Sequence, residues 1–395
     1  MNRIAASYLI IGDGSEPIRN GFVEYDETGC ICNVGQCEHP ETEPDFRDGI
    51  LTPGFVNSHC HLELSHLKGK FVKGSGMAGF IDQINALRDS SPEEEKIRLA
   101  HQWLDKMWKD GVSAMSDISN CSDTFAIKAS SKVYTRTFLE VFGTEPEDCE
   151  AVIRGVRQLK EEADSYGIDA APTPHSCYTM SPQLLTAASA EALKAGYLSY
   201  HSQESPQEED MIMYGTGALA ENYKGRNLST PPVTGHPALN YFIDRLTETG
   251  KSHFSEHILL VHNVCLSQQA ADYALGALDN VWFAVCPLSN LFIHNQLPPL
   301  DLMRANDLRI TLGTDSLSSN DTLDMVAEMF CIQKSFPHIP LSEIVRWASL
   351  NGAEFLSKEN VLGSLSAGKR PGIVLINEID ADGNLTEKSH SQRII

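Results

Sequence analysis

The stretch LTPGFVNSHCHLELSHLKG, residues 51–69, places His59 and His61 at positions i and i+2, directly after an apolar run. Side chains at i and i+2 of a β-strand point to the same side of the sheet. Both imidazoles would therefore project together from the carboxyl end of a buried strand, which is where α/β barrels build their active sites. One such pair alone is weak evidence for a metal site, because buried or surface histidines produce the same pattern.

Apolar runs of the same kind recur along residues 54–361. There are eight of them: GFVNSH, GVSAMSDI, KVYTRTFLEVFG, IDAAPTPHS, YLSYHS, HILLVHN, VWFAVCP and RITLGTDS. The segments between them carry apolar residues at three- and four-residue spacing, with Ser-Pro openings and Gly closings that are typical of helices. Eight strand–helix repeats predict an α/β fold of the (β/α)8 TIM-barrel type. A doubly wound sheet is the alternative, but it rarely places polar residues at so many strand ends.

The two ends of the chain have a different pattern. Residues 1–53 consist of short strand-like runs separated by turns, and this pattern returns in residues 362–395. Each piece is too short to bury a core by itself. We therefore expect 1–53 and 362–395 to form one small β-sandwich module, split in the sequence by a barrel at 54–361.

The composition excludes several classes of partner. Lys and Arg number 31 against 53 Asp and Glu, a net charge of −22, so a basic surface for nucleic acid or anionic membranes is not expected. No apolar stretch is long enough to span a membrane, and the N-terminus does not resemble a signal peptide. We expect a small-molecule substrate and a homodimer.

The ten cysteines are spread over the chain, several within apolar runs, which favours reduced thiols and a cytoplasmic location. Cys30, Cys32 and Cys37 form a C-x-C-x4-C cluster, for which only His39 is a nearby fourth ligand. A zinc knuckle and a simple hairpin both fit this cluster, and its role stays open.

Further polar residues follow the other strand-like runs. They are His175 in PTPHS, His201 in YLSYHSQES, His262 in ILLVHN and Asp315 in ITLGTDS. Each alone could be a helix cap or a polar residue at a loop end. Together with the first two histidines they would give one barrel mouth a ligand set suited to Zn2+ or Fe2+ with an open position for water.

Glu204 follows His201 by three residues, so it can reach the same pocket without binding the metal. A divalent ion lowers the pKa of its bound water to about 7, and an unligated carboxylate nearby can take and redeliver protons. Capping the helix expected near Pro206 is a second role for Glu204. His262 is placed to orient the attacking water.

The strings PGFVNSHCH, HSQE, VHN, CPLSN and LGTDS resemble the amidohydrolase superfamily, and most closely its cytosine deaminase, chlorohydrolase and S-adenosylhomocysteine deaminase branch. The closing GSLSAGKRPGIVLI is similar to the return of that branch into its small sheet, so the resemblance covers nearly the whole chain. It implies four metal ligands, a general acid/base, a histidine that contacts the hydrolytic water and a substrate contact. The implied metal ligands are His59, His61, His201 and Asp315, and the implied general acid/base is Glu204. His262 would contact the hydrolytic water, and His175 would contact the substrate. Binuclear members carry a bridging lysine after strand four, whereas this chain has APTPHS, which implies one metal ion, Zn2+ first and Fe2+ second.

The resemblance further implies a metal-dependent hydrolytic deaminase in which metal-bound hydroxide attacks an amino-substituted heterocycle and ammonia leaves. Our first expectation for the substrate is an aminated purine nucleoside such as 6-aminodeoxyfutalosine or an adenosine-like compound. A chlorohydrolase or cyclic-amide hydrolase with the same site is the alternative. A non-catalytic binding protein is a third reading, against which the intact ligand set and Glu204 argue.

Two further features bear on the substrate. Glu63 in HCHLEL resembles the acidic residue of the HxHxE string in aminodeoxyfutalosine deaminases, which would accept hydrogen bonds from a sugar or an amine. A glutamate in a surface loop fits the string equally well. The segment 206–240 is long, polar and rich in Gly and Pro, and it follows strand five, so we expect a lid over the pocket.

Overall fold

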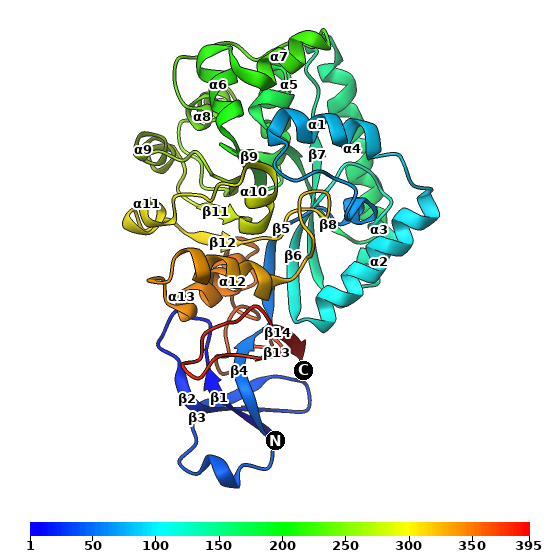
Figure 1. Ribbon diagram of the computed structural model, residues 1–395. Coiled ribbons are helices and arrows are strands. Elements are labelled where there is room, and N and C mark those ends of the chain that lie inside the picture. The colour runs from blue at the N-terminus through cyan, green and yellow to red at the C-terminus, as the bar shows by residue number, and fades with distance from the viewer.

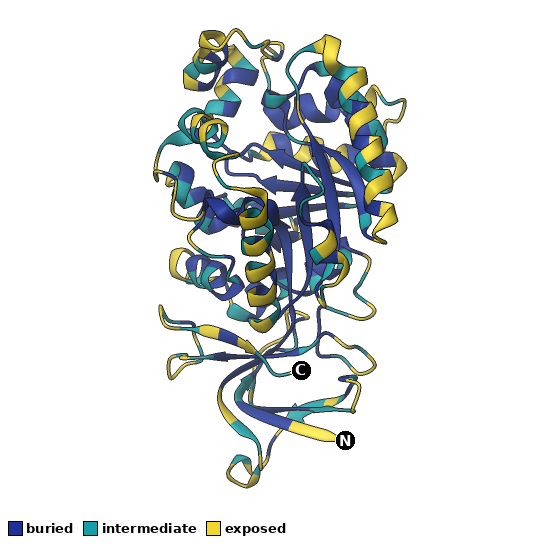
Figure 2. Cartoon of the chain, turned by 90° about the vertical axis from the view of Figure 1, so that its right-hand side faces the viewer, coloured by how far each residue is buried: buried dark blue, intermediate teal, exposed yellow.

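The computed structural model describes residues 1–395, and each of the eight apolar runs forms a β-strand (Figure 1). These strands are β5 (Phe55–Cys60), β6 (Val112–Ser119), β7 (Tyr134–Val141), β8 (Asp169–Pro174), β9 (Tyr197–Ser202), β10 (His257–His262), β11 (Val281–Val285) and β12 (Ile310–Leu312). They pair in parallel as two four-stranded sheets, β5-β6-β7-β8 and β12-β11-β10-β9. Nearly every residue of these strands is buried, as expected for parallel strands covered on both faces (Figure 2).

Hydrogen bonds join the two sheets at both seams. Between β8 and β9, the amide of His201 donates to the carbonyl of His175 at 2.9 Å. Between β12 and β5, the amide of Asp315 donates to the carbonyl of His59 at 3.0 Å. Gly313 makes this second seam fit, because a Cβ at that position would lie 2.8 Å from the amide nitrogen of His59. The eight strands therefore enclose one core, and the predicted (β/α)8 architecture is confirmed.

Helices follow the barrel strands and expose their outer faces to solvent (Figures 1 and 2). They are α2 (Glu93–Lys109), α3 (Phe125–Ala129), α4 (Cys149–Ser165), α5 (Pro182–Lys194), α8 (Ala238–Thr247), α9 (Gln268–Ala277), α11 (Leu300–Ala305), α12 (Met325–Ser335), α13 (Leu341–Trp347) and α14 (Leu350–Phe355). Four more helices lie in the loops after β5, β9 and β11: α1 (Gly76–Leu87), α6 (Pro206–Tyr214), α7 (Gly217–Gly225) and α10 (Pro287–His294). Short 3-10 turns complete the chain: η1 (Pro40–Thr42), η2 (Leu62–Leu67), η3 (Pro146–Asp148) and η4 (Cys177–Thr179).

The Ser-Pro pairs in the sequence mark helix starts, as predicted. The hydroxyl of Ser181 accepts the amide of Leu184 at the start of α5, and the hydroxyl of Ser205 accepts the amide of Glu208 at the start of α6. In both helices proline occupies the first turn, where its missing N–H costs nothing. The second of these starts fixes the chain directly after Glu204.

Both ends of the chain form the small module at the bottom of Figure 1, where the two termini also lie. Its strands are β1 (Asn2–Leu9), β2 (Ile18–Tyr25), β3 (Ile31–Gln36), β4 (Phe46–Pro53), β13 (Ile373–Asn377) and β14 (His390–Arg393). They make one continuous six-stranded sheet in the order β14-β13-β4-β1-β2-β3. Because β13 pairs antiparallel with β4, the chain returns to its own beginning after the barrel. Side chains from both ends share one apolar cluster there: Ile4, Ala6, Leu9, Val23, Ile31, Leu51, Leu365, Ile373 and Leu375. The division at 1–53, 54–361 and 362–395 stays a prediction.

The cysteine cluster lies in this module, and all ten cysteines of the chain are free thiols. Cys37 is buried and accepts a long hydrogen bond from Arg3. Cys30 directly precedes β3, and Cys32 is the second residue of that strand. Strands β2 and β3 form an antiparallel pair here. The three thiols do not converge into a set of metal donors, and this geometry favours the hairpin over the zinc knuckle.

Candidate active site

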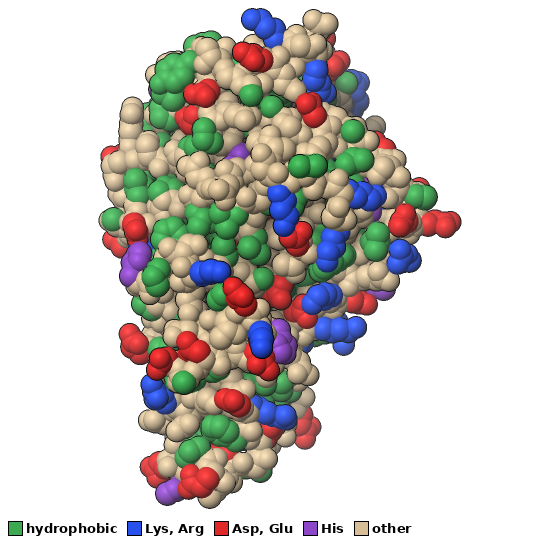
Figure 3. All heavy atoms as spheres, viewed as in Figure 1, with side chains coloured by type: hydrophobic (Ala, Val, Ile, Leu, Met, Phe, Trp, Pro, Cys, Tyr) green, Lys and Arg blue, Asp and Glu red, His purple; other side chains and the backbone are tan.

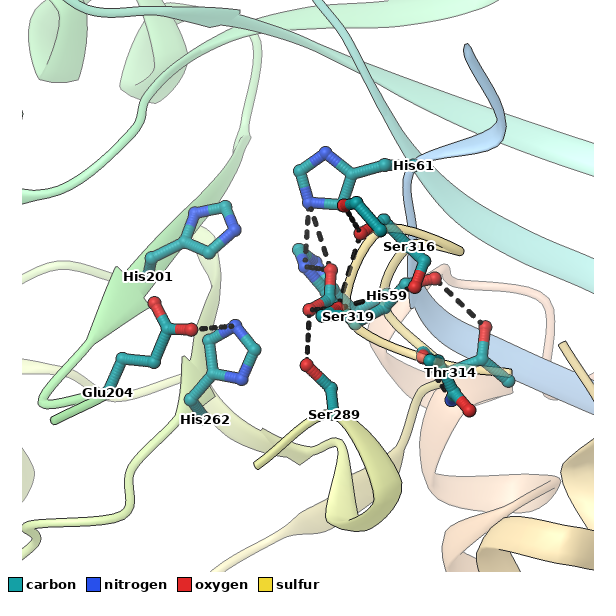
Figure 4. A network of polar contacts seen from close by, with 12 residues as sticks. His59, His61, His201, Glu204, His262, Ser289, Thr314, Ser316 and Ser319 are labelled. Carbon is teal, nitrogen blue, oxygen red and sulfur yellow. Dashed lines mark hydrogen bonds and ion pairs between the residues drawn. The ribbon is translucent and has the colours of Figure 1, made fainter. Parts of the chain in front are cut away.

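Six side chains predicted from the sequence come together at the carboxyl ends of the barrel strands. Figure 4 labels His61, His201, Glu204 and His262 among them. The cavity there has a volume of about 370 Å³. It is lined by His61, His175, His201, Glu204, His262 and Asp315. His59 lies directly beside them and is fully buried.

Three donor atoms form the densest group. The Nε2 atoms of His59 and His61 are 3.1 Å apart, and Oδ1 of Asp315 lies 3.6 Å and 3.4 Å from them. Oδ2 of Asp315 accepts the hydroxyls of Ser289 at 2.6 Å and Ser319 at 2.7 Å, so the other oxygen faces the imidazoles. His201 and His262 form a second set of donors with His59.

Imidazole nitrogens and a carboxylate oxygen are the donors that Zn2+ and Fe2+ prefer, and the residues present fit a divalent metal ion. Burial lowers the pKa of His61 to about 4, and it also lowers the pKa values of His59 and His262. These imidazoles are therefore neutral at pH 7, which is the form that binds metal.

His262 and Asp315 hold unusual backbone conformations. Their φ angles are +76° and +56°, in the left-handed region that residues other than glycine rarely adopt. Each residue lies where its strand ends, and the turn directs its side chain into the barrel mouth. Such conformations cost free energy and persist where the surrounding structure enforces them, as at functional sites.

Glu204 is buried beside the cavity, with Oε1 3.6 Å from Nε2 of His262 (Figure 4). Burial raises the pKa of its carboxyl to about 8. Nδ1 of His262 lies 3.1 Å from the side-chain amide nitrogen of Asn290, which leaves Nε2 to face Glu204. The carboxyl can thus exist in both protonation states near neutral pH, as a group that accepts and returns a proton must.

His175 lies in the cavity wall at the end of β8. Its ring stacks on that of His201, with centroids 4.4 Å apart, and its Nδ1 is held at 2.8 Å by the hydroxyls of Ser176 and Thr179. Burial lowers its pKa to about 3. A neutral, fixed imidazole of this kind can contact a substrate ring, and that role stays a prediction.

Glu63 is buried rather than in a surface loop. Its carboxylate accepts Arg88 Nη2 at 3.0 Å and the backbone amide of Asn120 at 2.9 Å, and it does not line the cavity. Arg88, at the end of α1, does line the cavity. The link from Glu63 to the cavity therefore runs through Arg88, and a direct substrate contact from Glu63 stays a prediction.

The segment 206–240 forms α6, α7 and the start of α8, and it supplies part of the cavity wall through Tyr223, Arg226 and Leu228. The adjoining wall comes from α1, with apolar side chains of Met77, Phe80, Ile81 and Ile84. Gln207 on α6 accepts the amide of Ala78 on α1 at 2.9 Å, so the two loop insertions are tied together. The sequence did not indicate α1 as a cavity wall, because its pattern is that of any amphipathic helix.

One charged neighbour of the ligand set was missed from the sequence. Glu140, near the end of β7, is buried and lies in the cavity wall, with Oε1 3.2 Å from Nδ1 of His201. Burial opposes charge on His201, but the attraction of Glu140 outweighs it and raises the pKa of the imidazole to about 9. His201 would therefore release a proton when it binds a metal ion. The rule that found the other residues, a polar side chain at a strand end, also applies to TFLEV and would have found Glu140.

We expect Glu140→Gln to lower zinc affinity about 10- to 100-fold, because a carboxylate on the second nitrogen orients a ligating imidazole and makes it a better donor. Competition with a chromophoric chelator measures the dissociation constant. Glu191→Gln, on the outside of α5, is the matched control. Equal affinities for Glu140→Gln and wild type would contradict this role.

A second prediction concerns Glu208, which accepts the backbone amides of Gln203 and Glu204 from a fully buried position on α6. Burial raises the pKa of this carboxyl to about 8, from an ordinary value of 4.5. Between these values the folded protein binds one more proton than the unfolded chain, so the free energy of unfolding falls as the pH rises through this window. We expect metal-free Glu208→Gln to lose less stability than wild type between pH 5 and pH 8, by an amount on the order of a few kcal/mol. Urea unfolding at several pH values measures this difference, and the control is Glu221→Gln, at an exposed position of α7. Parallel pH dependences of wild type and Glu208→Gln would refute the assignment.

The surface carries no large basic patch on the face shown in Figure 3, where Lys and Arg lie interspersed with Asp and Glu. None of the helices combines the length and the apolar character that crossing a membrane requires.

Comparison with known proteins agrees with this geometry. The model of the amidohydrolase family matches residues 50–391, and the chain belongs to this family. An adenosine deaminase of Helicobacter pylori is 26% identical over 379 residues, covering 93% of this chain and 89% of that protein. The crystal structure of Helicobacter pylori aminofutalosine deaminase with methylthio-coformycin matches with a TM-score of 0.78 at 22% identity, over 100% of both chains. An adenosine deaminase from Xanthomonas campestris with bound zinc matches with a TM-score of 0.70 at 18% identity, over 95% of this chain and 84% of that one. The resemblance stated from the motifs is thus confirmed.

Proposed function

We propose that this protein is a zinc-dependent hydrolytic deaminase of an aminated purine nucleoside, such as 6-aminodeoxyfutalosine or an adenosine-like compound. The class of hydrolytic deaminase is confirmed by the family and by relatives such as the Helicobacter pylori adenosine deaminase; the substrate and the residue roles are our proposal. The observation that carries it is Glu204, an unligated carboxyl in the cavity wall beside the donor set, with a pKa of about 8.

In this proposal His59, His61, His201 and Asp315 hold the metal ion. A bound divalent ion supplies an acidified water as the nucleophile. Glu204 would take one proton from the water and deliver it to the ring nitrogen, and would then take the second proton from the added hydroxyl and deliver it to the leaving amine. His262, held by Asn290, keeps its Nε2 toward Glu204 and the site of attack.

The shape of the cavity supports a nucleoside over a free base. Its polar end, with His175 and Glu204, suits the ring that is deaminated, whereas α1 and Leu228 make the other end apolar. Arg88, held by Glu63 and by Asn120 at 2.7 Å, lies in the wall with donors to spare for polar groups of the substrate. A substrate that carries an apolar group beyond its sugar would use both ends.

We also propose a cytoplasmic location and a homodimer. The ten free thiols support the first of these proposals. Sedimentation of the purified protein tests the second.

Ammonia release tests the proposed function. The metal-loaded protein is incubated with adenosine, 5′-methylthioadenosine, 6-aminodeoxyfutalosine, guanine, a chlorotriazine and a cyclic amide. We expect ammonia from at least one of the 6-aminopurine nucleosides, with kcat/KM above that for guanine. Release of chloride, or opening of the cyclic amide without ammonia from any nucleoside, would favour the alternative hydrolase and overturn the proposed substrate class.

A further inference from the structure

Helix α10 supports two of the side chains on which the proposed reaction depends. The hydroxyl of Ser289, in its first turn, donates to Oδ2 of Asp315 at 2.6 Å (Figure 4). The next residue, Asn290, contacts Nδ1 of His262 at 3.1 Å. Both supporting residues are fully buried, so the position of α10 determines where these contacts fall.

The position of α10 depends in turn on Glu328, whose carboxyl group is fully buried on α12. Its Oε2 accepts the backbone amide of Leu288, in the first turn of α10, at 2.9 Å. This amide has no partner within its own helix, because the first N–H groups of a helix never do. One side chain of α12 therefore fixes the end of α10 that carries Ser289 and Asn290.

Glu328 also fixes the loop that follows β12. Its Oε1 accepts the side-chain amide of Asn320 at 2.7 Å, and the same amide donates to the carbonyl of Thr314 at 2.9 Å. Thr314 directly precedes Asp315, whose φ of +56° needs external support. Asp315 is thus held from two sides, through α10 and through its own backbone, and both supports meet at Glu328.

We propose that Glu328 is a positioning residue for the active site, one that aligns Asp315 and His262 without touching substrate or metal. The kinetic test of this inference rests on the proposed function. The inference goes beyond that function because it assigns a role to a residue outside the cavity. Glu328 does not line the cavity, and both of its oxygens are used by the two N–H donors. A shift of about 1 Å in a catalytic group can cost about 100-fold in rate. Glu328 can therefore affect the reaction without contacting the substrate, and we call its hydrogen bonds to Leu288 and Asn320 the Glu328 clamp.

Two substitutions test the clamp. Glu328→Gln keeps the size of the side chain but places an NH2 group opposite one of the two donors, and Glu328→Met removes both acceptors. Met329→Leu, a buried neighbour on the same helix, is the control for disturbed packing. We expect kcat per bound metal to fall about 10-fold in Glu328→Gln and about 100-fold in Glu328→Met, with KM within about threefold of wild type. The Gln variant carries the test if the Met variant does not fold.

A double-mutant cycle separates positioning from general destabilisation. If Glu328 acts in part through α10, its substitution should cost clearly less kcat in an Asn290→Ala, Ser289→Ala background than in wild type, because the contacts of α10 are already gone and only the support through Asn320 remains. Fully multiplicative effects would place Glu328 outside this path and overturn the proposal.

Zinc affinity gives a readout that needs no substrate. We expect Glu328→Gln to weaken zinc binding about tenfold, as loss of an outer support of a ligand does, while Met329→Leu does not. Unchanged affinity and unchanged kcat in folded Glu328→Gln, with only a lower Tm, would reduce Glu328 to a structural role. If wild type deaminates none of the nucleosides while Glu328→Gln still weakens zinc binding, the proposed function fails and the clamp on Asp315 stands.

Discussion

Glu204→Gln is expected to bind zinc like wild type and to lose about 10²–10⁴-fold in kcat on the true substrate, the usual contribution of a general acid/base. The amide keeps the size of the carboxyl, so the cavity wall and the contact with His262 change little. It cannot accept a proton from water or return one to the leaving amine. Steady-state ammonia release and metal analysis of the same preparation measure the two properties together.

Glu209→Gln is the matched control, since Glu209 lies on α6, the helix that begins just after Glu204, is partly buried and does not line the cavity. Its kcat should stay within a few-fold of wild type. Wild-type turnover by Glu204→Gln would show that another group moves the proton. Loss of zinc from Glu204→Gln would instead make Glu204 a ligand, and the donor set would have to be redrawn.

The sequence predicts the barrel and the candidate ligands for one physical reason. Parallel strands are buried over their full length, so a polar side chain becomes tolerable where the strand leaves the core. His59, His201 and Asp315 each occupy such a position, and the common direction of the strands brings their ends to one face of the barrel. The candidate ligands can be predicted from local patterns because each of them lies at or just after the end of a strand.

Other parts of the site depend on contacts that no local pattern reveals. Arg88 reaches the cavity because Glu63 and Asn120 hold it, and these three residues come from three separate segments. Glu328 lies on an ordinary buried helix face, and nothing in its neighbourhood in the sequence indicates that it accepts an amide from α10. The left-handed conformations of His262 and Asp315 likewise arise from the turns that the packed barrel enforces.

In the terminal module, too, some features can be predicted from the sequence and others cannot. Short strands bounded by glycine and proline are visible in the sequence, and their separation by the barrel indicates that the two ends must meet. The strand order β14-β13-β4-β1-β2-β3 cannot be predicted from the sequence. It depends on which edge of the N-terminal sheet is free when the chain returns from the barrel. Gly372 illustrates the limit: its φ of +81° lies in the left-handed region that favours glycine, and this conformation arises from the loop that leads into β13.

His201→Ala is expected to reduce bound metal from about one equivalent per chain to a small fraction of it and to abolish turnover. His201 presents one nitrogen to Glu140 and belongs to the donor set with its ring between those of His59 and His175. Alanine removes a donor and also leaves Glu140 as a buried carboxylate without its partner, so the weakened site faces an unpaired charge. Elemental analysis after dialysis against a weak chelator measures the metal content.

His257→Ala is the matched control, because His257 lies at the opposite end of barrel strand β10, against Trp282, and takes no part in the donor set. Undiminished metal in folded His201→Ala would remove His201 from the ligands and shift the site to His59, His61 and Asp315 alone.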